Sequence, residues 1–165
     1  MLETNWHHLR SWIPARIATP APVLDLAERL AGFAADFAAD REWRFAMFTH
    51  DDAKLLGEVA LFPRSATGRV HVGKSDRAEL GYWLRADETG KGFATEAARA
   101  LLSVAERIPA FSHIEIRCDA RNLPSAGVPQ RLGFILKTTI IEPTVDAAPV
   151  HLQVWVSELR NDATP

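Results

Sequence analysis

The chain has 165 residues, 47% of them hydrophobic, which suits one globular domain that buries about 70% of its unfolded surface. Its formal net charge of -2, with 24% charged residues, offers no basic field for nucleic acid or an anionic membrane. The lone Cys118 excludes an internal disulfide and predicts a reducing, cytoplasmic setting, and the sequence shows neither a signal peptide nor an apolar run of ~20 residues.

The first half of the chain predicts one helix and a strand pair. Residues 1–22 form an irregular segment rich in Trp, His and Pro. Residues 23–39 carry apolar side chains at helical spacing, which predicts an amphipathic helix. Strands are expected at 44–49 and 55–62, joined by a turn at 50–52, and residues 63–74 are interpreted as a loop or weak edge strand.

The second half alternates strands and helices. A strand is predicted over 79–85, a helix over 95–108, a strand over 113–118 and a short helix over 122–132. Further strands are expected from residue 133 and over 152–156, and residues 161–165 should fray. With no repeat or linker in the sequence, this order predicts a single domain over 1–165 with a mixed α/β (α+β) sheet flanked by helices.

A glycine-rich turn separates the predicted strand 79–85 from the helix that follows it. The sequence Gly90-Lys91-Gly92-Phe93-Ala94 places several backbone N–H groups at a helix start, where they have no intrahelical acceptor. Together with the positive end of the helix dipole, these groups make an anion site. The turn therefore predicts a cradle for a pyrophosphate-sized anion, although the glycines could also simply shape a tight turn.

Two common phosphate-binding motifs do not fit this turn. A dinucleotide loop needs Gly or Ala at its sixth position, where this chain has Thr95. A nucleoside triphosphate loop needs Ser or Thr after its lysine, but Lys91 is followed by Gly92.

Four segments in register point to one family. Residues 89–94, TGKGFA, resemble the coenzyme A loop Gln/Arg-x-x-Gly-x-Gly/Ala of the GNAT superfamily of N-acetyltransferases. Residues 122–134, NLPSAGVPQRLGF, look like its second signature, Asn-x-x-Ser/Ala followed by Leu-Gly-Phe. The segments GEVAL (57–61) and ELGYWL (79–84) resemble the RimJ/RimL-like branch, which includes ribosomal-protein N-terminal acetyltransferases. Order and spacing agree over about residues 9–134.

The resemblance implies a GNAT fold, with a mixed, mostly antiparallel sheet and a shortened N-terminus. It also implies acetyl-coenzyme A as co-substrate and no metal, in line with six histidines that form no metal-binding motif. The residues expected to bind the cofactor are Leu84, Arg85, Thr89, Gly90, Lys91, Gly92, Phe93, Ala94, Thr95, Asn122 and Ser125. Asn122 is also a good N-cap for the helix it precedes.

Acetyl transfer to an amine requires removal of an amine proton, an oxyanion donor and a donor to the leaving thiolate. The resemblance points to Glu79 as the base, with a solvated edge charge as the competing interpretation. The backbone N–H of Leu84 is the oxyanion candidate, on a strand that must splay to admit the thioester. Ser125 is the hypothesis for the leaving-group donor, unless it only caps or packs its helix.

Three departures from the family pattern have consequences. Thr89 replaces a long Gln or Arg donor, so weaker pyrophosphate binding is expected. Pro129 stands where many members carry a tyrosine that protonates the thiolate, and a proline inside this helix predicts a short or kinked helix. Few residues precede the segment from residue 9, so either the first strand is missing, or another chain or a later segment covers that sheet edge. An exposed edge makes a homodimer plausible.

The sequence thus predicts an N-acetyltransferase that moves an acetyl group directly from acetyl-coenzyme A to a primary amine, either a protein N-terminus or a small amine. An aminoglycoside-type antibiotic acetyltransferase is the alternative among enzymes. A non-catalytic acyl-coenzyme A-binding or sensing module is the alternative from another class. Neither nucleic acid nor a membrane is an expected partner.

Overall fold

The structure is a computed structural model, and it describes residues 8–9, 12, 23–51, 53–143 and 149–159. The expectations for the N-terminal segment, apart from residues 8, 9 and 12, and for the tail 161–165 lie outside these ranges.

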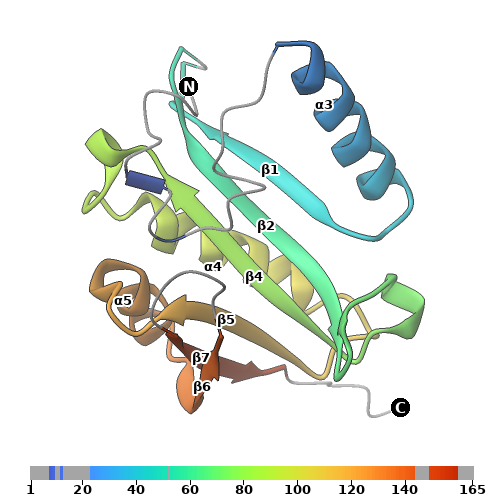
Figure 1. The fold of residues 1–165 in the computed structure, drawn as a ribbon, viewed down its shortest axis with the longest axis vertical. Helices are drawn as coiled ribbons and strands as arrows, with labels where there is room; N and C mark the ends of the chain where they lie inside the picture. The colour runs from blue at the N-terminus through green and yellow to red at the C-terminus, as the bar shows by residue number, and fades with distance from the viewer. Residues whose placement is uncertain (1–7, 10–11, 13–22, 52, 144–148, 160–165) are drawn as a thin grey trace.

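A seven-stranded sheet forms the body of the molecule, with the strand order β1-β2-β4-β5-β7-β6 and with β3 paired to β2 (Figure 1). Within the described ranges, β4 and β5 pair in parallel and every other neighbouring pair is antiparallel. The expected mixed, mostly antiparallel sheet is therefore confirmed. The strands are β1 Trp43–Phe48, β2 Leu55–Ser65, β3 Gly68–Arg69, β4 Arg77–Leu84, β5 His113–Asp119, β6 Ile135–Glu142 and β7 Val150–Glu158.

In the part of the chain from residue 23 on that the structure describes, three α-helices accompany the sheet. Helix α3, Val23–Ala38, lies along the β1 edge, where the ring of Phe37 packs edge-on against Phe45 at 5.7 Å (Figure 1). Helices α4, Phe93–Ala105, and α5, Leu123–Arg131, cover one face of the sheet. Short 3-10 turns, η1 Val72–Lys74 and η2 Ala86–Glu88, flank β4.

The hydrophobic core lies between the sheet and the helices α4 and α5. Alternate residues of the central strands point into it, because successive side chains of a strand face opposite sides. Phe111 and Ile114 are fully buried there, and Leu61, Leu80 and Ile116 are 1% exposed. The opposite face of β2, β4 and β5 carries charged side chains, among them Glu58, Arg64 and Glu79, together with the apolar Phe62 and Trp83, and this is the face on which the candidate site lies.

The interpretation of residues 63–74 as a loop or weak edge strand was wrong for residues 63–65. Strand β2 continues through Pro63, which lies opposite Ala78 of β4. The Arg85 N–H donates to the Leu56 carbonyl oxygen at 2.8 Å, which makes these two residues a hydrogen-bonded pair. Hydrogen-bonded pairs recur at every second residue of an antiparallel ladder, so the even-numbered residues of β2 bond to β4. Pro63 lies between two of these bonded positions. Its missing N–H is not needed by β4, and its carbonyl accepts from Val70 N–H at 3.0 Å.

Candidate active site

Strands β4 and β5 separate soon after they start. Their parallel ladder consists of Ala78 opposite Ile114 and Glu79 opposite Glu115, although β4 continues to Leu84 and β5 to Asp119. In Figure 1 the two strands are close at one end and diverge toward α5. A cavity of about 750 Å³ occupies this part of the molecule, with walls from β2, β4, β5 and the start of α5. The two strands are therefore splayed, as expected for a strand that has to admit a thioester beside Leu84.

The backbone of Leu84 faces the gap between the separated strands. Leu84 lies opposite Gly57 of β2, and the next residue, Arg85, donates its N–H to Leu56. Because bonding alternates along an antiparallel pair, the N–H and C=O groups of Leu84 point away from β2. A Cβ on Gly57 would lie 2.0 Å from the carbonyl oxygen of Trp83, so glycine permits the close approach of the two strands here. The Leu84 N–H therefore points into the gap, and its role as oxyanion donor stays a prediction.

The glycine turn at residues 90–92 lies directly before helix α4. Gly90 and Gly92 have φ angles of 77° and 91°, in the left-handed region that favours glycine. Gly92 is the N-cap of α4, and the first helical bond is the one from Glu96 N–H to Gly92 carbonyl oxygen at 3.0 Å. The N–H groups of Phe93, Ala94 and Thr95 thus stand at the open end of the helix. Because the N-cap residue Gly92 has no side chain, no side-chain acceptor caps these N–H groups.

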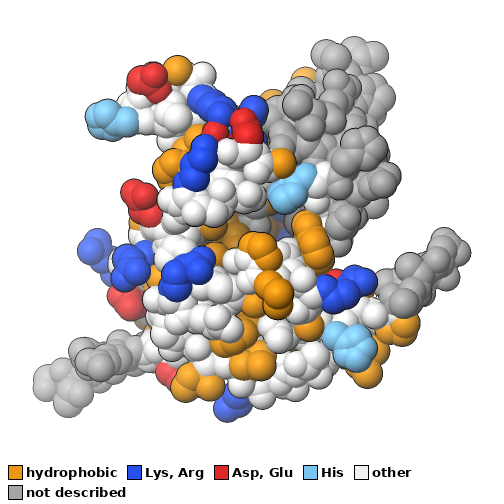
Figure 2. All heavy atoms as spheres, turned by 90° about the vertical axis from the view of Figure 1, so that its left-hand side faces the viewer, with side chains coloured by type: hydrophobic (Ala, Val, Ile, Leu, Met, Phe, Trp, Pro, Cys, Tyr) orange, Lys and Arg blue, Asp and Glu red, His pale blue; other side chains and the backbone are white. Residues whose placement is uncertain are grey.

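The cations near this turn are paired with carboxylates. Lys91 Nζ contacts Glu88 at 2.9 Å, and Lys54, from the β1–β2 connection, contacts the same carboxylate. Arg85 pairs with Asp87 at 3.0 Å. These ion pairs hold positive side chains beside the turn while leaving Lys91 52% exposed. Figure 2 shows this side of the molecule, with hydrophobic side chains in its middle and Lys and Arg side chains around them.

The other predicted cofactor residues lie around the same corner. Thr89 donates its hydroxyl to the carbonyl oxygen of Ala86 at 3.0 Å, so in this structure it closes η2. Thr95 accepts a hydrogen bond from Arg131 Nε of α5 at 3.1 Å, which ties the two helices together. Both residues flank the turn in the chain, and their contacts to a cofactor stay predictions.

Asn122 caps α5 as predicted. Its side-chain oxygen accepts from Ser125 N–H at 3.2 Å, and both residues line the cavity. Ser125 donates its hydroxyl to the phenol oxygen of Tyr82 at 3.3 Å. The Ser125 hydroxyl is therefore held beside β4 at the cavity wall, and its role as donor to a leaving thiolate stays a prediction.

Tyr82 is a site residue that sequence reasoning missed. Pro129 lies inside α5 and has no N–H to donate to the carbonyl four residues earlier, which belongs to Ser125. The Tyr82 hydroxyl donates to that carbonyl at 2.8 Å, across from β4. Burial raises the pKa of Tyr82, so the phenol stays protonated as a donor. The prediction that Pro129 makes the helix short holds, since α5 has nine residues.

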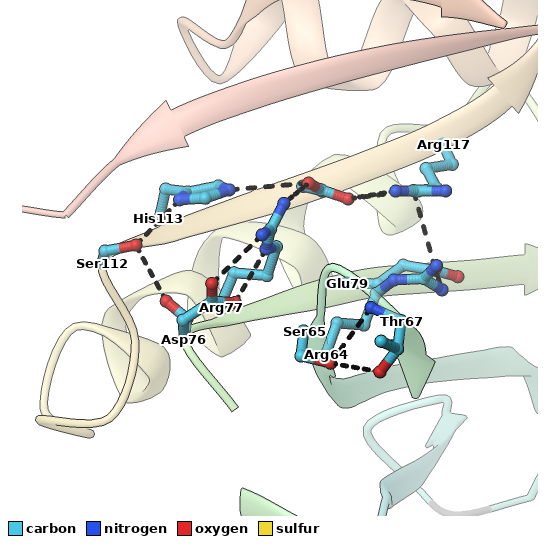
Figure 3. A network of polar contacts seen from close by, with 10 residues as sticks. Arg64, Ser65, Thr67, Asp76, Arg77, Glu79, Ser112, His113 and Arg117 are labelled. Atoms are coloured by element: carbon cyan, nitrogen blue, oxygen red, sulfur yellow. Dashed lines mark hydrogen bonds and ion pairs between the residues drawn. The ribbon is translucent and has the colours of Figure 1, made fainter. Parts of the chain in front are cut away.

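Glu79 lies on the cavity wall but is tightly paired. Its carboxylate accepts from Arg64 at 2.6 Å, and Arg117 lies at 4.0 Å (Figure 3). It also accepts from Arg69 at 3.1 Å. Leu84 lies five positions further along the extended strand, so the Cα atoms of Glu79 and Leu84 are roughly 17 Å apart. The competing interpretation of Glu79 as a solvated charge does not fit its 14% exposure. Its role as a base stays a prediction.

A second carboxylate, Glu58 of β2, lines the same cavity. It lies opposite Trp83, the residue before Leu84, and it accepts from Arg44 at 2.8 Å. Burial raises the pKa of Glu58, and Arg44 opposes this shift. The sequence shows several acidic residues that could face an amine, but only the strand register brings this one beside Trp83.

Among the described residues, no cluster of His, Cys, Asp and Glu is arranged to hold a metal ion. The helices within the described ranges include none with the length and hydrophobicity needed to cross a membrane.

The chain is similar in sequence to two proteins of Bacillus subtilis. The chain is 32% identical over 107 residues to "Probable N-acetyltransferase YjcK" of Bacillus subtilis, covering 65% of this chain and 56% of that protein. It is 31% identical over 84 residues to "Putative ribosomal N-acetyltransferase YdaF" of the same organism, covering 51% of this chain and 42% of that protein. The chain thus spans about half the length of these two relatives.

The fold also matches solved structures. The RimL ribosomal L7/L12 α-N-protein acetyltransferase in complex with coenzyme A superposes with a TM-score of 0.80 at 16% identity, over 98% of this chain and 86% of that one. Residues 2–135 match the family described as "Acetyltransferase (GNAT) domain". The expected fold is confirmed, and the chain belongs to the GNAT acetyltransferase family.

Proposed function

We propose that this protein is an N-acetyltransferase that transfers the acetyl group of acetyl-coenzyme A directly to a primary amine. The observation that carries the proposal is that β4, which has separated from β5, ends at Leu84 and is joined by residues 85–92 to the open N-terminus of α4. An elongated thioester can place its diphosphate on the amides at residues 92–95 and its acyl group in the gap. The similarity to YjcK, a probable N-acetyltransferase, and to RimL, an α-N-protein acetyltransferase, supports this assignment.

In the proposed reaction, the Leu84 N–H stabilises the oxyanion that forms from the acyl carbonyl oxygen. The Ser125 hydroxyl donates a hydrogen bond to the departing thiolate. The proton acceptor is a carboxylate of the cavity wall: the family resemblance implies Glu79, and Glu58 lines the same cavity. The cofactor is held by Arg85, Thr89, Lys91 and the amides of the glycine turn at one end, and by Asn122 at the other.

The acceptor is proposed to be a protein N-terminus or a small amine. The ribosomal-protein descriptions of YdaF and RimL favour the N-terminus. The expected homodimer and cytoplasmic location stay predictions, and sedimentation velocity would test the first of them.

Release of free thiol from acetyl-coenzyme A tests the proposal. A panel of peptides, aminoglycosides and polyamines is supplied in turn, and we expect turnover with at least one class and none without an amine. Calorimetry with coenzyme A is run in parallel. Tight binding without turnover on any amine would favour the acyl-coenzyme A-binding module instead, and no binding would reject both functions.

A further inference from the structure

Two carboxylates on one cavity wall compete for the amine proton of the proposed reaction. Both Glu58 and Glu79 lie on the face of the sheet opposite the hydrophobic core and line the cavity. They differ in their distance from the acyl position and in the cations that surround them.

Strand register places Glu58 next to the acyl position. Glu58 and Trp83 are direct cross-strand partners, and Leu84 is the following residue on β4. The Cα atom of Glu58 lies about 5 Å from that of its partner Trp83, one residue before Leu84, whereas Glu79 lies roughly 17 Å from Leu84 along the strand. A proton acceptor has to reach the nitrogen within hydrogen-bond distance or through one water. Glu58 meets this condition more closely than Glu79.

The charge balance around the two carboxylates also differs. Arg44 serves two carboxylates, because it donates to Glu42 at 2.5 and 3.2 Å as well as to Glu58 at 2.8 Å. Glu79 instead serves two guanidinium groups, those of Arg64 and Arg69. A proton on Glu79 would disrupt both of its ion pairs, whereas a proton on Glu58 leaves Arg44 paired with Glu42.

The remaining surroundings of Glu58 favour proton exchange. The charged groups that face it are Arg44 and Glu42, and its partner on β4, Trp83, is uncharged. Its side chain is 23% exposed, so it can pass a proton to solvent. Burial and the repulsion by Glu42 raise the pKa of Glu58, which brings the carboxylate closer to the range in which it can accept a proton.

We infer that Glu58 accepts the proton of the acceptor amine, an inference that rests on the proposed acetyl transfer. The ammonium nitrogen gives one proton to the Glu58 carboxylate, which later releases it to solvent. The freed nitrogen lone pair forms the bond to the acyl carbon, and the carbon–sulfur bond breaks. A second nitrogen proton ends on the sulfur, directly or through the Ser125 hydroxyl.

The test compares Glu58→Gln with wild type on a peptide that carries a free α-amine. At pH 6.5, where the amine is mostly protonated, we expect kcat/KM to fall about 100-fold or more, with an unchanged Kd for acetyl-coenzyme A. At pH 9.5, where an amine of pKa ~8 is mostly neutral, the defect should shrink by about tenfold or more. A defect of equal size at both pH values, or no defect, would overturn the assignment.

Three further variants complete the design. Glu106→Gln, at the exposed end of α4, is the matched control and should behave as wild type. Glu79→Gln tests the competing base. A fall in its kcat/KM with the pH dependence expected for Glu58→Gln would assign the proton to Glu79. Arg44→Gln removes the cation partner of Glu58, so the acidic limb of the kcat/KM profile should move to higher pH. An unmoved limb would contradict the inference even if Glu58→Gln failed to fold.

The activities of wild type and Glu58→Gln distinguish a failure of this inference from a failure of the proposed function. If wild type binds acetyl-coenzyme A and transfers acetyl to no amine, the proposed function fails and the role of Glu58 fails with it. If wild type is active and Glu58→Gln is equally active at pH 6.5, only the assignment of Glu58 fails.

Discussion

At the scale of single residues, Gly92 has the clearest conformational requirement of the site. Its φ of 91° lies where an L side chain is strained by about 1–2 kcal/mol, although a Cβ there would meet no atom within 4 Å. We expect Gly92→Ala to shift the start of α4 and to raise the Kd for acetyl-coenzyme A about tenfold, because the amides of residues 93–95 lose their alignment. Isothermal titration calorimetry measures this change.

Gly32 of α3 provides the matched control for that substitution. It too has nothing within 4 Å of a built Cβ, but it lies inside a helix with ordinary backbone angles. Gly32→Ala should raise the free energy of unfolding by about 0.5–1 kcal/mol and leave the Kd unchanged. Equal Kd values for Gly92→Ala and wild type would show that the turn does not bind the diphosphate.

Residue roles were predictable where they depend on nearby residues. The N-cap role of Asn122 follows from its place before a helix, and the left-handed turn follows from Gly90 and Gly92. The surroundings of Glu79 were not predictable, because Arg64, Arg69 and Arg117 reach it from three other strands.

At the scale of elements, α5 depends on a donor from another element. The Tyr82 hydroxyl supplies Ser125 with the hydrogen bond that Pro129 cannot make. Tyr82→Phe should lower the free energy of unfolding by about 1–2 kcal/mol, because it leaves a carbonyl in this part-buried place without its donor. In a Pro129→Ala background the backbone N–H of residue 129 can bond to Ser125, so the same substitution should cost about 1 kcal/mol less.

Urea denaturation of the four proteins in this double-mutant cycle measures the coupling between the two positions. Additive effects, within about 0.3 kcal/mol, would mean that the Tyr82 hydroxyl does not replace the missing helical bond. Far-UV circular dichroism of each variant checks that α5 and the sheet are retained.

The elements themselves were largely predictable from the sequence. Helix α3 was expected at 23–39 and spans Val23–Ala38, and β5 was expected at 113–118 and spans His113–Asp119. Both have strong spacing patterns of apolar residues. The extension of β2 through Pro63 was missed, because proline argues against a strand unless its neighbours are known to need no N–H.

At the scale of the whole molecule, a buried carboxylate links the two central strands where they still pair. Glu115 is 4% exposed and accepts from Arg117 at 2.7 and 2.9 Å and from Arg77 at 3.3 Å (Figure 3). Burial acts in the opposite direction, but the two guanidinium groups lower the pKa of Glu115 below its usual value. The folded state therefore holds this proton less tightly than the unfolded chain does.

This difference predicts acid sensitivity of the fold. The stability that Glu115 contributes is present above its unfolded pKa, ~4.3, and is lost as pH falls through the lower folded value. Glu115→Gln should reduce the free energy of unfolding by about 2 kcal/mol at pH 7 and should flatten its decline between about pH 5 and 3. Urea titrations at several pH values measure both effects, and parallel curves for variant and wild type would contradict the prediction.

The order of elements, the glycine turn before α4 and the cap of α5 were readable from the sequence, because each depends on residues within a few positions of one another. The family followed from the same local motifs, taken in order along the chain. The tertiary structure decided where β4 and β5 separate, why Tyr82 meets Ser125 and which carboxylate lies opposite Trp83. These features depend on the register between strands and helices far apart in the chain, and spacing along a single segment carries no information about that register.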